Sequence, residues 1–585
     1  MADKSKARLE GRLAEERGAV RKPWADQIKI ALCFPAPYRV AMANLGFQTV
    51  YVLLNEEPDV LCERAVFPET DELDRLRRTG AVLTTLESER PLLDFEVAAF
   101  SVPFETNLVQ LVGMLELAKI PLKAANRAKA AGPEAPLVMA GGVALTLNPE
   151  PIAEFLDLVA IGEAEAILPE FLARLREAKA RKEPRRKWLL RLLDAPGLYV
   201  PAMYRVRYGE DGTIQERQSL NQAPEQIRRA APKTLAGVST RSRLFTTGVE
   251  FEDMALLEIS RGCGQGCRFC AEGFLLRPPR HRPLAELAAE IPGLRQERNK
   301  LGLIAPTLSD FPELLPLLDE IKRQGAELSV SSLRLDKLDE RLLAALSASG
   351  HRTITLAPEA GSERLRRAIN KPISEQSILT AARQIGKARI PEVKLYFLIG
   401  LPTETAADAA EIPVLVRKIQ TALALGAGKK HFPGAIGLSV NPFVPKPWTP
   451  FQWHPMDDEK SLEEKMRVIR SELRQDRQIT ISGESPRQAR VQELLARGDR
   501  RVGEMILAGW QSGGNWAKVL RERETALEFY IDRPRFSDEI LPWDFVDVGV
   551  LKSYLLEEYH RAHAGKVTPI CNPKKCRTCG ACAEQ

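Results

Sequence analysis

The chain of 585 residues contains no run of about 18 consecutive apolar residues, which is the length that a membrane-spanning helix requires. Its first residues also lack the apolar core of a secretory signal peptide, so we expect a cytoplasmic protein with no membrane partner. Neither sign of charge is in large excess, because the net charge is +6 while 28% of the residues are charged. So mild a positive charge does not by itself indicate a nucleic-acid partner.

Histidine is scarce, and the six histidines all lie at or after His281. The N-terminal part of the chain therefore offers no imidazole to a metal. Cysteine is also scarce, but three of the nine cysteines lie within 263–270 and four within 571–582, while Cys33 and Cys62 stand apart. In a chain without a signal peptide, clustered cysteines indicate a metal or iron–sulfur centre rather than disulfides.

Two series of alternating strands and helices are predicted. The first has strands at 28–34, 97–102, 136–140 and 158–161, with helices such as 46–54, 108–118 and 151–155 between them. This order predicts a doubly wound α/β domain with a parallel sheet. The second series has strands at 256–260, 302–305, 327–331, 353–357, 393–399 and 436–441. Six βα units in succession predict a partial parallel barrel, (β/α)6.

These patterns divide the chain into six parts. We expect a charged N-terminal arm (1–24), the doubly wound domain (25–180), a linker (181–245), the partial barrel (246–455), a helical region (456–565) and a cysteine-rich tail (566–585). Within the linker, Glu210-Asp211-Gly212 is the turn signal of a β-hairpin over 199–218. The basic run at 172–190 is typical of a solvated helix that leads into a linker.

Three cysteines follow the first strand of the predicted barrel with the spacing C-x3-C-x2-C: Cys263, Cys267 and Cys270. A 4Fe-4S cluster normally takes four thiolates, so three leave one iron open to another ligand. The glycines before and between these cysteines allow a tight loop. The loop also lies where such barrels place their chemistry, at the carboxyl end of a strand. A zinc site completed by a distant residue is the alternative.

The segment 257–270, with Phe269 before the third cysteine, resembles the signature of the radical S-adenosylmethionine (SAM) superfamily. The resemblance implies that SAM binds the open iron and is cleaved reductively to a 5′-deoxyadenosyl radical. It also implies an electron donor such as flavodoxin or ferredoxin. The ends of later strands are similar to the superfamily as well, and the SAM-binding residues implied are Phe269, Ser331, Arg334, Glu359 and Gly400.

Single assignments among these residues have a simpler alternative, a helix cap or a surface pair; Ser362, for example, would cap the helix that follows it. The second barrel strand ends in Ala305-Pro306-Thr307 and not in the Gly-Gly-Glu that is frequent in the superfamily. The carboxylate that usually binds the amine of SAM is therefore left unassigned.

The N-terminal series resembles the cobalamin-binding module that precedes the barrel in one large class of radical SAM proteins. The resemblance rests on Ser101, Gly141, Gly142 and the segments 148–151 and 161–163. At the carboxyl edge of an open sheet, two glycines allow a large flat ligand to approach and a serine can hydrogen-bond to it. The loop after the first strand lacks Asp-x-His-x-x-Gly, so either cobalamin binds without a histidine ligand or the domain is a scaffold over the barrel mouth.

The match to a subfamily of cobalamin-domain radical SAM proteins extends over nearly the whole chain, at 45–51, 443–453, 484–487 and 497–501. The resemblance implies a radical SAM enzyme that functionalises an unactivated carbon and, if cobalamin binds, does so by cobalamin-dependent methyl transfer. Methylthiolation of RNA or protein is disfavoured. Relatives with that activity carry three cluster cysteines in an N-terminal domain, whereas the N-terminal half of this chain has only Cys33 and Cys62. An RNA-binding or assembly factor with structural clusters would use the basic segments 181–191 and 497–501, and nothing else in the sequence supports a nucleic-acid partner.

Four further cysteines lie near the C-terminus with the spacing C-x4-C-x2-C-x2-C: Cys571, Cys576, Cys579 and Cys582. Four thiolates so close in sequence can saturate one metal centre. The ferredoxin-like spacing suits a second 4Fe-4S cluster, and a structural zinc that staples the tail is an equal alternative. A tail with free thiols is disfavoured, because exposed cysteines are a liability.

Overall fold

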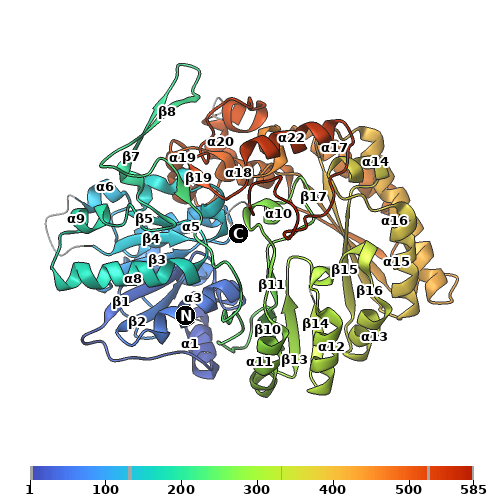
Figure 1. The fold of residues 1–585 in the computed structure, drawn as a ribbon, viewed down its shortest axis with the longest axis horizontal. Helices are drawn as coiled ribbons and strands as arrows, with labels where there is room; N and C mark the ends of the chain where they lie inside the picture. The colour runs from blue at the N-terminus through green and yellow to red at the C-terminus, as the bar shows by residue number, and fades with distance from the viewer. Residues whose placement is uncertain (1–3, 129–134, 331–332, 524–526, 583–585) are drawn as a thin grey trace.

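The computed structural model of the chain describes residues 4–128, 135–330, 333–523 and 527–582 (Figure 1). The helix α1 (Lys4–Glu15) precedes a six-stranded sheet with the strand order β2-β1-β3-β4-β5-β6. The strands are β1 (Ile28–Phe34), β2 (Val60–Val66), β3 (Val97–Ser101), β4 (Leu137–Gly141), β5 (Leu158–Ala160) and β6 (Leu198–Tyr199). All pairs are parallel except that of β5 with β6. The predicted doubly wound parallel sheet is thus confirmed.

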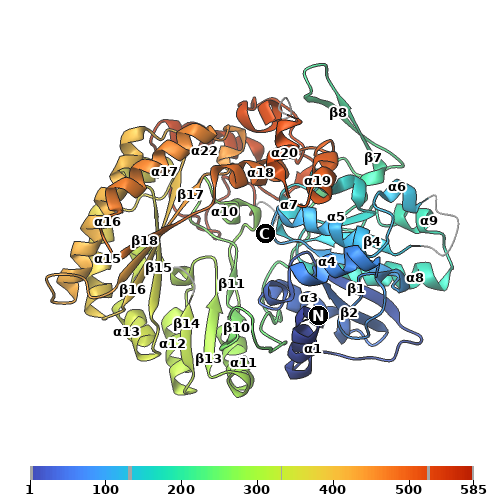
Figure 2. The same cartoon turned by 180° about the vertical axis from the view of Figure 1, so that it is seen from behind.

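Strands of this sheet read as continuous apolar runs because helices cover both faces. The main helices of this part are α3 (Leu45–Glu56), α4 (Thr70–Thr79), α5 (Asn107–Leu117), α7 (Val143–Leu147), α8 (Ala164–Ala180) and α9 (Arg185–Leu190). The predicted helix at 151–155 is a 3-10 helix, Glu150–Phe155. The hairpin consists of β7 (Tyr204–Tyr208) and β8 (Ile214–Ser219), which project from the molecule in Figures 1 and 2.

Two strands of this sheet were not predicted, β2 and the two-residue β6, and the composition of β2 explains why it was missed. Strand β2 is buried at every residue, yet it contains Glu63 and Arg64. The guanidinium of Arg64 donates to Glu16 and Glu87, and Glu63 accepts from Thr85 at 2.6 Å. Buried charges are tolerated only when they are paired, and here the partners lie outside the strand in sequence. Glu63 and Arg64 therefore interrupt the apolar pattern by which a buried strand is recognised in a sequence.

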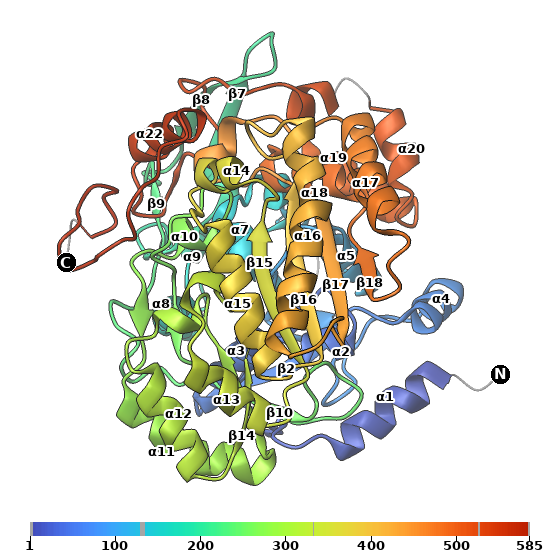
Figure 3. The same cartoon turned by 90° about the vertical axis from the view of Figure 1, so that its right-hand side faces the viewer.

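The barrel comprises two parallel sheets. One contains β10 (Met254–Glu258), β13 (Lys300–Ile304) and β14 (Glu327–Val330), and the other contains β15 (Thr353–Glu359), β16 (Glu392–Ile399), β17 (Ala435–Pro442) and β18 (Ile479–Ser482). A parallel bridge between Leu333 and Leu356 joins them. The six predicted strands form in order, and β18 adds a seventh that was expected to be helical. Figure 3 shows the helices on the outer face of β15–β17.

The outer helices are α11 (Leu284–Glu297), α12 (Leu314–Arg323), α13 (Glu340–Ala348), α14 (Glu363–Ala368), α15 (Glu375–Lys387) and α16 (Ala406–Gly426). The C-terminal helices are α17 (Glu459–Leu473), α18 (Pro486–Arg497), α19 (Val502–Gln511), α20 (Trp516–Arg521) and α22 (Lys552–His563). Helices α18 to α20 lie above the junction of the two sheet-containing parts (Figure 2). Helix α19 packs on α5, where a Cβ on Gly113 would lie 2.7 Å from the Trp510 ring. Among the described residues, none of the helices combines the length and the hydropathy needed to cross a bilayer.

Candidate functional site

The loop that carries the first three cysteines, residues 262–270, is called the cluster loop below. It connects the short strand β11 (Ser260–Arg261) to helix α10 (Glu272–Leu275). Gly262 and Gly266 have φ of +77° and +69°, and a Cβ on Gly262 would lie 2.2 Å from the carbonyl oxygen of Leu276. Since a side chain has no room there, the tight path of the loop depends on glycine.

The three cysteines of the cluster loop are partly buried. Burial raises the pKa of the Cys267 thiol to about 11 and that of Cys270 to about 12. Within the described residues, no three His, Cys, Asp or Glu side chains converge on one metal-ion position. A cubane cluster distributes its ligands over separate irons, and three thiols on one glycine-rich loop suit such a cluster.

Buried polar side chains from distant elements fix the cluster loop. Arg268 is fully buried and donates to the carbonyl of Ala368 at 2.7 Å and to that of Lys566 at 2.8 Å. Asn370 donates to the carbonyl of Gly266 at 3.0 Å. Because an unpaired buried guanidinium would be costly, the pairing of Arg268 fixes the loop to both the barrel and the C-terminal segment.

The ends of the barrel strands provide charge beside the cluster loop. Glu359 ends β15 with φ of +67°, a strained value for a residue with a side chain, and it pairs with Lys371 at 2.9 Å. Lys371 and Arg334 both act electrostatically on Cys267, and Arg334 also pairs with Asp336 at 2.6 Å. The structure thus brings Arg334 and Glu359 to the same rim, together with a lysine that was not predicted. Ser331 lies outside the described residues.

Two predicted SAM contacts remain, Phe269 and Gly400, and they lie in different surroundings. Phe269 packs against an apolar cluster that includes Ala360, Leu401 and Phe443, which follow β15, β16 and β17 respectively. Gly400 has φ of +80°, and a Cβ there would lie 2.9 Å from Leu462. Close packing therefore accounts for this glycine without a ligand.

A carboxylate does lie near the end of the second barrel strand, although Gly-Gly-Glu is absent. Asp310 accepts a hydrogen bond from Lys337 at 2.5 Å and another from Gln265 of the cluster loop. Thr307, just before it in the sequence, has its hydroxyl 3.5 Å from the sulfur of Cys263. The loop after β13 therefore contacts the cluster loop through polar groups, and Asp310 is already paired.

A cavity of about 710 Å³ lies between the carboxyl edge of the six-stranded sheet and the barrel. It brings together the three residues predicted for cobalamin, Ser101, Gly141 and Gly142, and its opposite wall includes Ala305 and Pro306 from the end of β13. Gly142 has φ of +121°, and a Cβ on it would lie 2.4 Å from the carbonyl oxygen of Val102. Only glycine can form this wall without moving the backbone.

The inner part of the cavity is a mainly apolar slot between the sheet and the helices α3 and α8. Its lining includes Ile30, Leu32, Leu54, Val97, Ala99, Ile167, Leu168 and Phe171. The mouth is polar and is lined by Glu163, Glu165, Thr240, Glu258 and Arg261. None of the described residues that line the cavity is a histidine.

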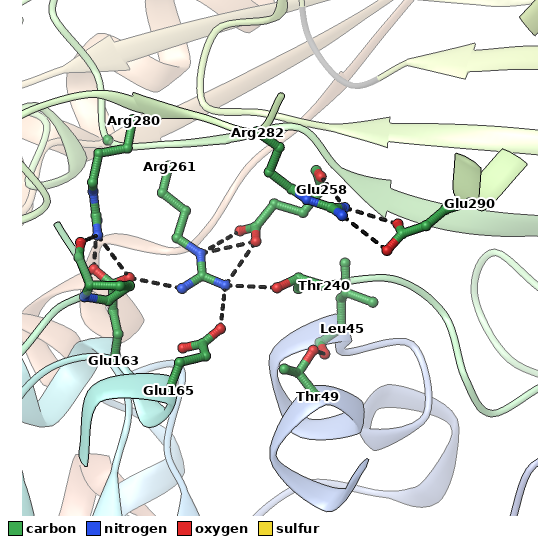
Figure 4. Close-up of polar contacts among 12 residues, drawn as sticks. Leu45, Thr49, Glu163, Glu165, Thr240, Glu258, Arg261, Arg280, Arg282 and Glu290 are labelled. Carbon is green, nitrogen blue, oxygen red and sulfur yellow. Dashed lines mark hydrogen bonds and ion pairs between the residues drawn. The ribbon is translucent and has the colours of Figure 1, made fainter. Parts of the chain in front are cut away.

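The polar groups at the mouth join the domain of the six-stranded sheet to the barrel (Figure 4). Arg261 donates to Glu163 at 2.8 Å, to Glu165 at 2.7 Å and to Glu258 at 2.9 Å. Glu163 also accepts from Arg280 at 2.6 Å and from Arg229 at 3.0 Å. These six side chains, with three charges of each sign, are called the domain clamp below.

Burial by itself would raise the pKa of Glu163, but the hydrogen bonds from Arg280 and Arg261 outweigh burial and hold its pKa below the usual value. The segment 161–163 was predicted only as part of a family pattern, and its glutamate proves to be the centre of the domain clamp. The partners of Glu163 lie up to 117 residues away in the sequence, so no local signal could have identified them.

Comparison with known proteins agrees with this geometry. Residues 46–201 match the family model of the N-terminal region of radical SAM proteins, and residues 257–413 match that of the radical SAM superfamily. The uncharacterized protein MJ0966 of Methanocaldococcus jannaschii is 31% identical over 424 residues, which cover 72% of this chain and 81% of that protein. A tRNA-2-methylthio-N(6)-dimethylallyladenosine synthase of Desulfitobacterium hafniense is 28% identical over 28% of this chain and 40% of its own length.

Two of the solved structures that resemble the chain are radical SAM enzymes. The cobalamin-dependent enzyme OxsB has a TM-score of 0.46 and 15% identity over 67% of this chain, which spans about half of that enzyme, 52%. The methyltransferase TsrM of Kitasatospora setae has a TM-score of 0.45 and 15% identity over 70% of this chain and 73% of its own length. On the family models and the relative of 31% identity, the chain belongs to the radical SAM superfamily and is a radical SAM enzyme, whose cofactors are a 4Fe-4S cluster and SAM.

Proposed function

We propose that the enzyme binds cobalamin in the cavity between the sheet and the barrel, and that it transfers a methyl group to an unactivated carbon. The cavity is the observation that carries the proposal. It extends from the glycine edge at Gly141 and Gly142 to the residues Ala305 and Pro306 at the barrel rim. A ligand in this space would contact both the sheet and the barrel. Its volume of about 710 Å³ is within the range of cofactor sites.

The shape and chemistry of the lining suit a large cofactor with one planar face and an apolar appendage. The glycine edge leaves the backbone open to a flat macrocycle, and Ser101 at the neighbouring strand end can donate to a polar substituent. The slot lined by Leu32, Ala99 and Phe171 is apolar and suits an aromatic nucleotide tail. With no histidine in the lining, the lower face of cobalt would have no imidazole ligand from this domain.

The residues of the barrel would position SAM and its cluster. Cys263, Cys267 and Cys270 would hold the cluster, which supplies the electron for reductive cleavage of SAM when it is bound. Lys371 and Arg334 place positive charge beside the thiolates, and Phe269 packs against an apolar cluster of residues that includes Ala360. The domain clamp holds the cavity against this mouth, so both cofactors would face one reaction space.

Two alternatives are less well supported by the geometry. A methylthiotransferase-type cluster in the N-terminal half would need accessible cysteines, but Cys33 and Cys62 are both fully buried in β1 and β2. An RNA-binding surface at 497–501 would need several exposed basic groups, but Arg497 is fully buried, Arg500 pairs with Glu150 at 2.7 Å, and the exposed Arg501 pairs with Asp499 at 2.6 Å.

Cobalt analysis tests the proposal. Protein produced with a cobalamin supply and purified without oxygen should contain about one cobalt per chain, with the absorbance of cobalamin that has no histidine ligand. Ala99→Phe, which places an aromatic ring in the slot, should lose the cobalt and retain the iron. The control is Gly293→Ala in α11, where a Cβ has no neighbour within 4 Å. Cobalt near zero in the wild-type protein would leave the sheet domain as a scaffold only.

A further inference from the structure

We infer that the four C-terminal cysteines hold a second iron–sulfur cluster, which is assembled directly against the cluster loop. The first observation is a backbone contact between the two cysteine-bearing segments. The amide of Cys571 donates to the carbonyl of Gly264 at 2.8 Å. A Cβ on Gly264 would lie 3.4 Å from the carbonyl oxygen of Cys571, so the cluster loop and the tail are in van der Waals contact. The first tail cysteine is therefore a direct neighbour of the cluster loop.

Side chains reinforce this contact. The amide of Thr568 donates to Asn370 at 2.8 Å, and the same asparagine donates to Gly266 of the cluster loop at 3.0 Å. The hydroxyl of Thr568 donates to Glu558 at 2.6 Å, and Glu558 in turn pairs with Arg268. The hydrogen bonds of Thr568 to Asn370 and Glu558 thus hold the start of the tail beside the cluster loop.

Two of the four tail cysteines are buried, although much of the segment around them is exposed. Cys579 is 4% exposed and Cys582 is 2% exposed. The amide of Leu551 donates to the carbonyl of Cys579 at 2.9 Å, and Gly580, with φ of +90°, packs against Leu551. A short segment without an apolar core needs another source of folding free energy, and metal binding supplies it.

A buried arginine points to negative charge in the tail. Arg277 is 4% exposed, and its Nε has no hydrogen-bond partner within the described part of the chain. No carboxylate among the described residues forms an ion pair with it. Its side chain interacts with Cys579 and Tyr554, and it acts electrostatically on Cys571, Cys576 and Cys582. A buried guanidinium requires compensation, and a cluster with four thiolate ligands would provide it.

Arg277 also adjoins the cluster loop, because its Nη2 lies 3.1 Å from the position of a Cβ on Gly266. One cation thus lies between the two sets of cysteines. The C-x2-C-x2-C part of the tail has the spacing of ferredoxin-type clusters. The four tail thiols lie near one another, because Cys576, Cys579 and Cys582 all act electrostatically on Cys571. A structural zinc would use the same four thiolates, but the spacing and the contact with the cluster loop favour an iron–sulfur cluster.

Metal counting with spectroscopy tests the inference. After anaerobic reconstitution, the wild-type chain should hold about eight irons, and the variant Cys263→Ala/Cys267→Ala/Cys270→Ala should retain about four. After reduction, this triple variant should show the electron paramagnetic resonance signal of an iron–sulfur cluster. The variant Cys579→Ser/Cys582→Ser should also hold about four irons, while the exposed Lys575→Ala in the same tail should keep eight.

The variant that lacks the first three cysteines decides the question, because it does not alter the tail. If it holds no iron, the tail has no cluster and the inference is wrong. Zinc that disappears in Cys579→Ser/Cys582→Ser while the iron stays constant would equally overturn it, since the tail would then be a structural zinc site. Cobalt content should not change in either variant, so this result is independent of the cobalamin proposal.

Discussion

Glu163 is a single carboxylate between three guanidinium groups, those of Arg229, Arg261 and Arg280. Its side chain is 9% exposed, and the three arginines are 6% to 12% exposed. Removing water from these groups is costly, and their mutual attraction offsets that loss only while the set is complete. A change of one member therefore leaves charges without compensation.

Glu163→Gln should lower the free energy of unfolding by about 3–5 kcal/mol, the usual loss when a buried ion pair is broken on one side. Glutamine keeps the size of the side chain, so the effect would come from charge. Urea unfolding monitored by circular dichroism measures it. The control is Glu210→Gln in the exposed hairpin turn, which should change stability by less than about 0.5 kcal/mol. Equal stabilities of the two variants would show that the domain clamp does not stabilise the fold.

The sequence could identify those residues of the site whose role shows in a local sequence pattern. The three cysteines, the glycines of the cluster loop and the paired glycines of the sheet edge were predicted for that reason. Arg268 and Asn370 were missed because their partners are as far as 298 and 198 residues away. A buried arginine between two cysteines looks in the sequence like a surface residue.

At the scale of elements, Asp408 joins the beginnings of two helices at the barrel rim. It completes a capping box with Thr405 at the start of α16, and it accepts from Ser362 and Arg364 at the start of α14. Ser362 itself caps α14 by accepting from Leu365, which is the simpler role considered for it. Burial would raise the pKa of Asp408, but the hydrogen bonds from Arg364, Ser362 and Thr405 lower it to about 2.

This pKa predicts an acid-dependent loss of stability. Because the folded-state pKa of about 2 is below the unfolded value of about 3.9, the carboxylate stabilises the fold above pH 4, and the contribution is lost as the pH falls from about 4 towards 2. Asp408→Asn should therefore be about 1–2 kcal/mol less stable at pH 7. That difference should shrink below pH 4. Unfolding curves at pH 7, 5 and 3 measure it, with the exposed Asp74→Asn as the control; a constant difference would contradict the assignment.

Most strands could be predicted because parallel strands covered on both faces are short apolar runs. Of the strands that were missed, the two with more than two residues, β2 and β18, have the same physical origin. Strand β2 buries Glu63 and Arg64 as paired charges, and β18 has Thr480 and Ser482 exposed in the strand that follows β17. Neither strand therefore shows the composition of a buried strand, and only their partners in space identify them.

At the scale of the whole molecule, contacts between distant segments hold the sheet, the barrel and the C-terminal region together. The domain clamp closes one side of the cavity, helix α19 packs on α5, and the C-terminal segment from 566 onwards bonds to the cluster loop. The sequence could predict the sheet and the barrel but not their relative placement, because these contacts are long-range. The cavity, which exists only between the parts, could not be predicted for the same reason.

A chain that ends after Gly565 would lack the partners that Arg268 and Gly264 find in residues 566–571. Amide hydrogen exchange of the cluster loop should then become at least about tenfold faster, equivalent to ~1.4 kcal/mol of lost local stability. Exchange in β1 should be unchanged. Mass spectrometry of the two peptides measures this, and equal protection of the cluster loop in both proteins would show that the tail does not fix it.

The hydrogen bond from Arg268 to the carbonyl of Lys566 has a consequence for biosynthesis. The two residues are 298 positions apart, so at roughly 5–20 residues per second the ribosome adds Lys566 about 15–60 s after Arg268. During that interval the three cysteines have emerged, yet their loop has not gained its final partners. Cluster delivery to this protein is therefore expected to follow translation of the tail, and a nascent chain stalled before residue 566 should be a poor acceptor of iron.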